Sequence, residues 1–222
     1  MTYAQYVRIV NLLPEGPQDY MDIDAQQRDL HSRVSALEIA DTFLIWEAND
    51  VYTAGRRTKP EDIPDKNIPV IEMDRGGSVT YHGPGQIVMY PIIKVKPPQD
   101  VVAFVRATER ALITALRETW GIESIAIDGR SGVWIRRPGV EDRKICAIGI
   151  KFAQETTMHG LAFNVTTDLT KFGRIVPCGI NDAGVTSLAE QGVVVGLEEA
   201  ATALLPYLEA ELGHFALRNE EA

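Results

Sequence analysis

The sequence contains few cysteines: of 222 residues, only Cys146 and Cys178 carry a thiol, and no C-x-x-C pair occurs. Thiols stay reduced in the cytosol, so we expect no structural disulfide. A zinc site would have to gather Cys146, Cys178, His82 and His159 from distant positions, without the closely spaced ligand pairs typical of zinc proteins. We therefore expect no metal centre.

A long apolar run and a secretory leader are also missing. No stretch approaches the roughly 18 consecutive apolar residues that a membrane helix needs. The first residues, MTYAQYVRIV, show no basic patch followed by an apolar segment, which a signal peptide requires. We therefore expect a cytoplasmic protein without a membrane partner.

The chain has fewer basic than acidic residues. The chain has 22 Lys and Arg against 31 Asp and Glu, a formal net charge of −9, which argues against nucleic-acid binding. An acidic protein partner would have to dock on a local basic cluster. The two candidate clusters are Arg136, Arg137, Arg143 and Lys144, and Arg56, Arg57 and Lys59. Taken alone, each has the pattern typical of a solvated loop with scattered charge.

Neither of the common phosphate-binding loops occurs, since the chain holds no G-x-G-x-x-G and no G-x-x-x-x-G-K-[ST]. Those loops cradle phosphates with backbone N–H groups at a helix N-terminus. The sequence therefore gives no simple case for a bound nucleotide, and we expect no cofactor.

Short strands and a few helices make up most of the chain, which is 45% hydrophobic and long enough for one domain. Because strands occur in runs rather than in regular βαβ alternation, they predict an α+β fold with a mixed, mostly antiparallel sheet. We expect a single catalytic domain over residues 1–222, with the last dozen residues as a tail. Strands are predicted at 7–13, 42–47, 68–73, 86–95, 123–128, 132–137, 144–152 and 159–165, helices at 18–38, 101–120 and 197–212, and a mobile loop at 50–68.

The least ordinary segment is RGGSVTYHGPGQ, residues 75–86, with four glycines between two predicted strands. Glycine lets a backbone approach a ligand closely, so the segment suits the wall of a binding site, although a tight turn gives the same pattern. Arg75 could hold a carboxylate or phosphate, or pin the loop by donating to carbonyl groups. His82 could act as an acid or base, or only as an orienting donor.

A second segment, IVPCGI at residues 175–180, places Cys178 between a stiff proline and an open glycine. That setting would present a nucleophile to a carbonyl beside a backbone donor, although a lone cysteine is more often a small buried residue. Strand alternation predicts Lys144 on one face with Cys146, Ile148 and Ile150. Lys144 either extends outward at the strand end or has an anionic partner inside, for which a Cys178 thiolate would serve. Cys146 lacks the flanking proline and glycine of Cys178, so we predict that it is a core residue.

Four motifs together closely resemble the lipoyl(octanoyl) transferases over roughly residues 7–210. They are RGG-x-x-TYHGPGQ at 75–86, K-x-x-AIG at 144–149, HGLAFN at 159–164 and PCGI at 177–180, in the order found in that family. We see no departure at the family's active positions.

The resemblance implies the catalytic-domain fold of biotin and lipoate protein ligases. It implies that an octanoyl group moves from octanoyl-acyl carrier protein to a lysine of lipoyl domains, on 2-oxoacid dehydrogenase subunits and the glycine cleavage H protein. It also implies that Cys178 is the acyl-thioester nucleophile and Lys144 its activator. The acyl-binding segments of the family fall on Arg75, Gly76, Gly77, Ser78, Val79, Thr80, Tyr81, His82, Ala147, Ile148, Gly149, Gly160, Leu161 and Ala162.

Two other functions remain open. An ATP-dependent lipoate or biotin ligase would share the fold, but it would need a nucleotide-binding lysine and would not need Cys178. A non-catalytic acyl-binding module would bind the carrier protein without forming a covalent adduct.

Overall fold

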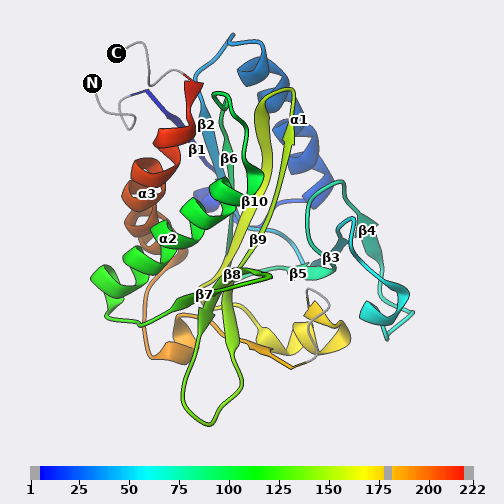
Figure 1. Ribbon diagram of the computed structural model, residues 1–222. Coiled ribbons are helices and arrows are strands. Elements are labelled where there is room, and N and C mark those ends of the chain that lie inside the picture. The colour runs from blue at the N-terminus through cyan, green and yellow to red at the C-terminus, as the bar shows by residue number, and fades with distance from the viewer. Residues whose placement is uncertain (1–5, 178–181, 218–222) are drawn as a thin grey trace.

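The computed structural model (Figure 1) describes residues 6–177 and 182–217, and its centre is one eight-stranded sheet. Strands β1–β2 and β9–β11 pair in parallel and the other neighbours pair antiparallel. The predicted fold class, a mixed and mostly antiparallel sheet flanked by helices, is confirmed. In sheet order the strands are β1 (Arg8–Asn11), β2 (Thr42–Trp46), β6 (Gln86–Ile92), β10 (Thr156–Asn164), β9 (Arg143–Ala153), β8 (Arg130–Ile135) and β7 (Ile125–Ile127), with β11 (Gly184–Val185) beside β9.

Helices cover both faces of this sheet because its central strands are apolar on both sides. Helix α1 (Tyr20–Ser35) packs on one face, and α2 (Val101–Trp120) and α3 (Leu197–Leu212) pack on the other (Figure 1). Strand β6 shows the division clearly. Ile87 and Met89 belong to the core under α2 and α3, while Val88 and Tyr90 belong to the core under α1.

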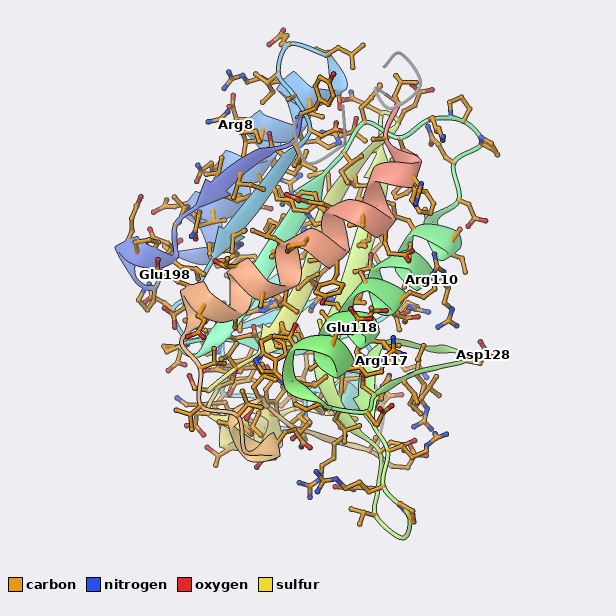
Figure 2. All side chains as sticks on the ribbon, turned by 90° about the vertical axis from the view of Figure 1, so that its left-hand side faces the viewer. Arg8, Arg110, Arg117, Glu118, Asp128 and Glu198 are labelled. Atoms are coloured by element: carbon orange, nitrogen blue, oxygen red, sulfur yellow. The ribbon has the colours of Figure 1, made fainter. Side chains whose placement is uncertain are left out.

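The ends of α2 follow from its sequence. The Asp100 carboxylate accepts the Ala103 N–H at 2.9 Å, as an N-cap does, and Gly121 ends the helix with φ of 65°, a conformation that glycine adopts readily. Figure 2 shows α2 and α3 side by side, with Arg110 and Glu118 on α2. Arg110 pairs with Glu211 of α3 at 2.8 Å, which ties the outer sides of the two helices together.

The glycine-rich segment runs into a second, smaller sheet, because β5 (Thr80–His82) is part of both. This sheet contains β4 (Val70–Glu72), β3 (Val51–Ala54) and β5. The predicted loop at 50–68 is therefore wrong for β3, whose Tyr52 and Thr53 are buried. Four residues are too few to show strand alternation, and the pairing partners of β3 lie far along the chain.

The chain stays packed beyond the point where the predicted tail begins. Leu212 and Ala216 are fully buried, and the Leu217 N–H donates to the Lys94 carbonyl at 2.8 Å. Pro206 lies inside α3 without dividing it. Within the described ranges, no helix is both long and apolar enough to cross a membrane.

Candidate active site

The glycine-rich segment lies across the middle of the main sheet and encloses a cavity there. Strands β9 and β10 form the floor, the 75–82 segment forms the opposite wall, and α1 contributes one side chain. The space in this cavity that the centre of a water molecule can reach is about 40 Å³. Its lining residues are Tyr20, Arg75, Gly77, Ser78, Thr80, His82, Val88, Tyr90, Ala147, Ile148, Gly149, His159, Gly160, Leu161 and Ala162.

Most of the predicted acyl-binding positions line this cavity; Gly76, Val79 and Tyr81 do not. Val79 and Tyr81 point into a separate cluster with Phe172, because alternate residues of an extended strand face opposite ways. The Tyr81 hydroxyl donates to Asp50, and burial together with this carboxylate raises the pKa of Tyr81. The acyl-binding role of the lining residues stays a prediction.

Arg75 is buried and holds the segment in shape. Its guanidinium donates to the carbonyl groups of Gly76 and Ser78, both at 2.9 Å, and to the carbonyl and hydroxyl of Thr53, both at 2.8 Å. Of the two roles open from the sequence, this geometry favours pinning the loop. The planar fork of arginine suits several carbonyl acceptors at once.

His82 is buried and neutral. Burial, followed by the nearby positive charge of Arg75, lowers the pKa of His82 to about 3. Its Nδ1 lies 2.8 Å from Gln86 Oε1, and the Gln86 amide nitrogen donates to Asn164 at 2.9 Å. Nδ1 is therefore the protonated nitrogen, and Nε2 is left as an acceptor. This geometry favours an orienting role over that of an acid at neutral pH.

Two floor glycines are required by close packing. A Cβ on Gly149 would lie 3.0 Å from the carbonyl oxygen of Gly76 in the segment above it. A Cβ on Gly160 would overlap the carbonyl oxygen of Met89 on the neighbouring strand. The segment therefore lies close against the sheet, and the cavity is a narrow slot rather than an open bowl.

Lys144 lines a smaller cavity that adjoins the slot. It shares this cavity with Thr80, Ala147 and Ala162, which also line the slot. The Lys144 side chain is buried, and its Nζ lies 4.6 Å from the centre of the Trp134 ring, in cation–π geometry.

A β-bulge decides which way Lys144 points. Val133 pairs with Cys146 and Trp134 pairs with Lys144, so one step along β8 spans two steps along β9. Ile145 and Cys146 both lie in the core under α2 and α3. The predicted shared face for Lys144 and Cys146 is therefore wrong, because the extra residue breaks the alternation.

Cys146 is the core residue that its setting predicts. It is fully buried, and burial raises the pKa of its thiol, against which the Lys144 charge acts only in part. A thiol of raised pKa is a poor nucleophile.

Pro177, directly before Cys178, and Val185, seven residues after it, line the same small cavity as Lys144. Strand β11 runs parallel to β9, with Val185 opposite Lys144. Cys178 itself lies outside the described residues. The structure therefore brings chain from both sides of the predicted nucleophile to the predicted activator.

Four lining residues were not predicted from the sequence as binding positions: Tyr20, Val88, Tyr90 and His159. His159 carried a signal, because it begins the HGLAFN motif, but we considered it only as a metal ligand. Tyr20 and Tyr90 join the site through the packing of α1 on the sheet, where their hydroxyls lie 3.3 Å apart. No group of three or more His, Cys, Asp or Glu among the described residues is placed to hold a metal ion.

The first basic cluster is largely offset by acidic neighbours. Arg136 pairs with Asp142 at 2.6 Å, and Arg143 lies 3.6 Å from Glu190. Arg137 instead donates to the neutral amide of Gln191 at 2.7 Å. Charge alone therefore gives this cluster less attraction for an acidic partner than the sequence suggested.

Solved structures of two protein ligases share this arrangement. A bipartite lipoate protein ligase from Thermoplasma acidophilum superposes with a TM-score of 0.68 at 15% identity, over 94% of this chain and 84% of that one. A biotin protein ligase from Aquifex aeolicus, solved with biotin and ATP, gives 0.51 at 15% identity, over 78% and 60% of the two chains. At these identities the likeness shows a shared fold, that of the lipoate and biotin ligase catalytic domains.

Sequence comparison narrows this class. The chain belongs to the lipoyl protein ligase A/B catalytic domain family, whose model matches residues 19–209. The octanoyltransferase of Thermobifida fusca (strain YX) is 47% identical over 213 residues, which span 93% of this chain and 90% of that protein. The octanoyltransferase of Salinispora tropica is 50% identical over 192 residues, 84% and 86% of the two chains. These relatives confirm the resemblance seen in the motifs and the prediction of an acyltransferase.

Proposed function

We propose that this chain, as one catalytic domain in the cytoplasm, moves an octanoyl group from octanoyl-acyl carrier protein to a lipoyl-domain lysine. The acceptors are the lipoyl domains of 2-oxoacid dehydrogenase subunits and the glycine cleavage H protein. The octanoyl group passes through a thioester on Cys178. Support comes from the curated relatives, which are named octanoyltransferases, and from the four motifs.

The observation that carries the proposal is the junction between the slot and the cavity of Lys144. Thr80, Ala147 and Ala162 line both spaces. An acyl chain in the slot would have its carbonyl at this junction, beside Lys144 and next to the segment that begins at Pro177. The Thr80 hydroxyl would orient the carbonyl there, since Thr80 lines both spaces.

In the first step the Cys178 thiolate attacks the carbonyl carbon of the carrier thioester. A new C–S bond forms, the bond to the carrier sulfur breaks, and the Lys144 ammonium supplies the proton for the departing thiolate. The Trp134 ring under Lys144 holds that ammonium in place. One thioester replaces another, so the step is nearly balanced in free energy and needs no ATP.

In the second step the neutral amine of the acceptor lysine attacks the acyl-enzyme. The amide forms, the C–S bond to Cys178 breaks, and Lys144, now neutral, accepts the proton released by the amine. Conversion of a thioester to an amide is downhill. Because the carrier must leave before the lipoyl domain enters, we expect ping-pong kinetics.

Intact mass spectrometry tests the covalent step. Wild type mixed with octanoyl-carrier protein without ATP should gain one octanoyl group that hydroxylamine removes. The adduct should be much reduced in Lys144→Ala, and Cys178→Ser should form no thioester. Cys146→Ser is the matched control and should keep the adduct, since Cys146 lies in the core.

Two outcomes would overturn the proposal. Octanoylation of a lipoyl domain that requires ATP and free octanoate, and that survives Cys178→Ala, would indicate a ligase of the same fold. Tight binding of the carrier protein with neither adduct nor transfer would indicate an acyl-binding module.

A further inference from the structure

The slot has two unlike ends along the paired strands β9 and β10. At one end Ala147 pairs with Ala162 next to the cavity of Lys144. Two pairs further along, Gly149 lies opposite Gly160, and the next residue of β10 is His159. At the strand rise of about 3.3 Å per residue, Ala162 to His159 spans roughly 10 Å, close to the length of an extended octanoyl chain.

His159 does not follow the alternation of its strand. Its pairing partner Ile150 packs in the core under α2 and α3, and a regular strand would place His159 there too. Its backbone instead has φ of 58°, which few non-glycine residues adopt. The side chain turns to the α1 face, where it lines the slot and meets the Tyr90 ring edge-on at 6.0 Å.

Helix α1 and the start of the glycine-rich segment hold His159 in this conformation. The Gln27 amide oxygen accepts the His159 backbone N–H at 2.5 Å. The imidazole Nε2 lies 2.9 Å from the Asp74 carboxylate, and Nδ1 lies 3.5 Å from the Gln27 amide nitrogen. A ring fixed at both nitrogens and at its backbone is a rigid wall rather than a mobile side chain.

Beyond the ring the environment changes from apolar to ionic. Asp74 also receives Lys151 at 2.6 Å and Arg28 at 3.3 Å, and the Asp74 side chain is 34% exposed. His159 is 1% exposed. Burial, opposed by Asp74, lowers the pKa of His159, so the ring facing the slot is neutral at pH 7. His159 thus separates the slot from a solvated ion cluster.

We propose that His159 is the end wall of the acyl slot and limits the acyl group to about the length of an octanoyl chain. This inference rests on the proposed function, since it assumes that the slot holds the acyl chain with its carbonyl near Lys144. A longer chain must then displace a clamped ring or leave its last methylenes unburied.

The test compares two substitutions that the backbone tolerates. Glycine at 159 accepts φ of 58° without strain, and asparagine is among the residues that tolerate the left-handed region. His31→Ala is the control, because His31 is a buried imidazole on α1, bonded to the Ala153 carbonyl at 3.0 Å and absent from the slot. Thermal unfolding identifies any variant that fails to fold, and His159→Asn carries the test if His159→Gly fails.

The measurement is kcat/KM for transfer from octanoyl-, decanoyl- and dodecanoyl-carrier protein to a lipoyl domain. For His159→Gly, burial of two further methylenes predicts that the ratio of kcat/KM for decanoyl- to that for octanoyl-carrier protein rises roughly tenfold. A smaller rise is expected for His159→Asn and none for His31→Ala. Ratios equal to wild type in both folded His159 variants would overturn the inference.

A calorimetric measurement of the affinities for free octanoate and decanoate separates this inference from the proposed function. If wild type transfers no octanoyl group, the proposed function fails. The inference that His159 limits the chain length is still supported if His159→Gly then gains affinity for decanoate relative to octanoate. If wild type transfers octanoyl groups and the His159 variants keep its preference between octanoyl and decanoyl groups, only the inference about His159 is refuted.

Discussion

Replacing Arg75 with methionine tests whether this residue pins the glycine-rich segment. The change removes four hydrogen bonds from a buried guanidinium to Gly76, Ser78 and Thr53 while keeping similar apolar bulk. Bonds to a charged group are each worth about 1.5–3 kcal/mol. Since such losses are not additive and water can reach some acceptors, we expect a total loss of about 4 kcal/mol.

For a chain of this size each kcal/mol lowers Tm by about 2–4 °C, so Arg75→Met should lower it by about 12 °C. Thermal unfolding followed by circular dichroism measures this. Arg75→Lys should recover less than half of the loss, because an ammonium lacks the planar fork. Octanoyl transfer should fall along with stability, since the segment forms a wall of the slot.

Arg136→Met provides the control, because Arg136 is 55% exposed and pairs with Asp142 at the surface. A surface ion pair contributes about 0–1 kcal/mol, so Tm should move by only a few degrees. The pinning argument is refuted if Arg75→Met keeps the Tm of wild type and loses only octanoyl transfer. That result would assign Arg75 to holding a ligand, the other role open from the sequence.

Three further predictions follow from buried groups and the surface. Burial lowers the pKa of His82 to about 3, so the unfolded chain binds the proton first and stability is lost as the pH falls below about 6.5. Urea unfolding should show a loss of about 2 kcal/mol between pH 7 and pH 5 from this residue, and His82→Asn should flatten the profile by that amount. Gly160→Ala should cost about 3 kcal/mol or more, because the added Cβ meets the Met89 carbonyl, whereas Gly173→Ala, with nothing within 4 Å, should change the free energy of unfolding by less than about 0.5 kcal/mol. If the carrier protein docks on the basic cluster that contains Arg137, Arg137→Glu should slow acyl-enzyme formation from octanoyl-carrier protein and weaken its salt dependence. An unchanged rate would exclude that cluster as the docking surface.

The sequence by itself determined the layers of the fold and most of the slot. Helix α2 begins at Val101 and ends at Trp120, as its apolar spacing and the caps Asp100 and Gly121 predict. The glycine-rich segment and the HGLAFN strand stood out by composition, and both line one cavity. Local features of this kind are readable because caps, periodicity and glycine content act over only a few residues.

Only the tertiary structure decided how the site is assembled. The bulge at Ile145 separates Lys144 from Cys146, and strand alternation predicts the opposite. His159 reaches the slot because Gln27 accepts its backbone N–H at a positive φ and Asp74 bonds its imidazole ring, both from distant parts of the chain. Bulges and strained conformations depend on contacts between residues far apart in sequence, so no short window of the chain encodes them.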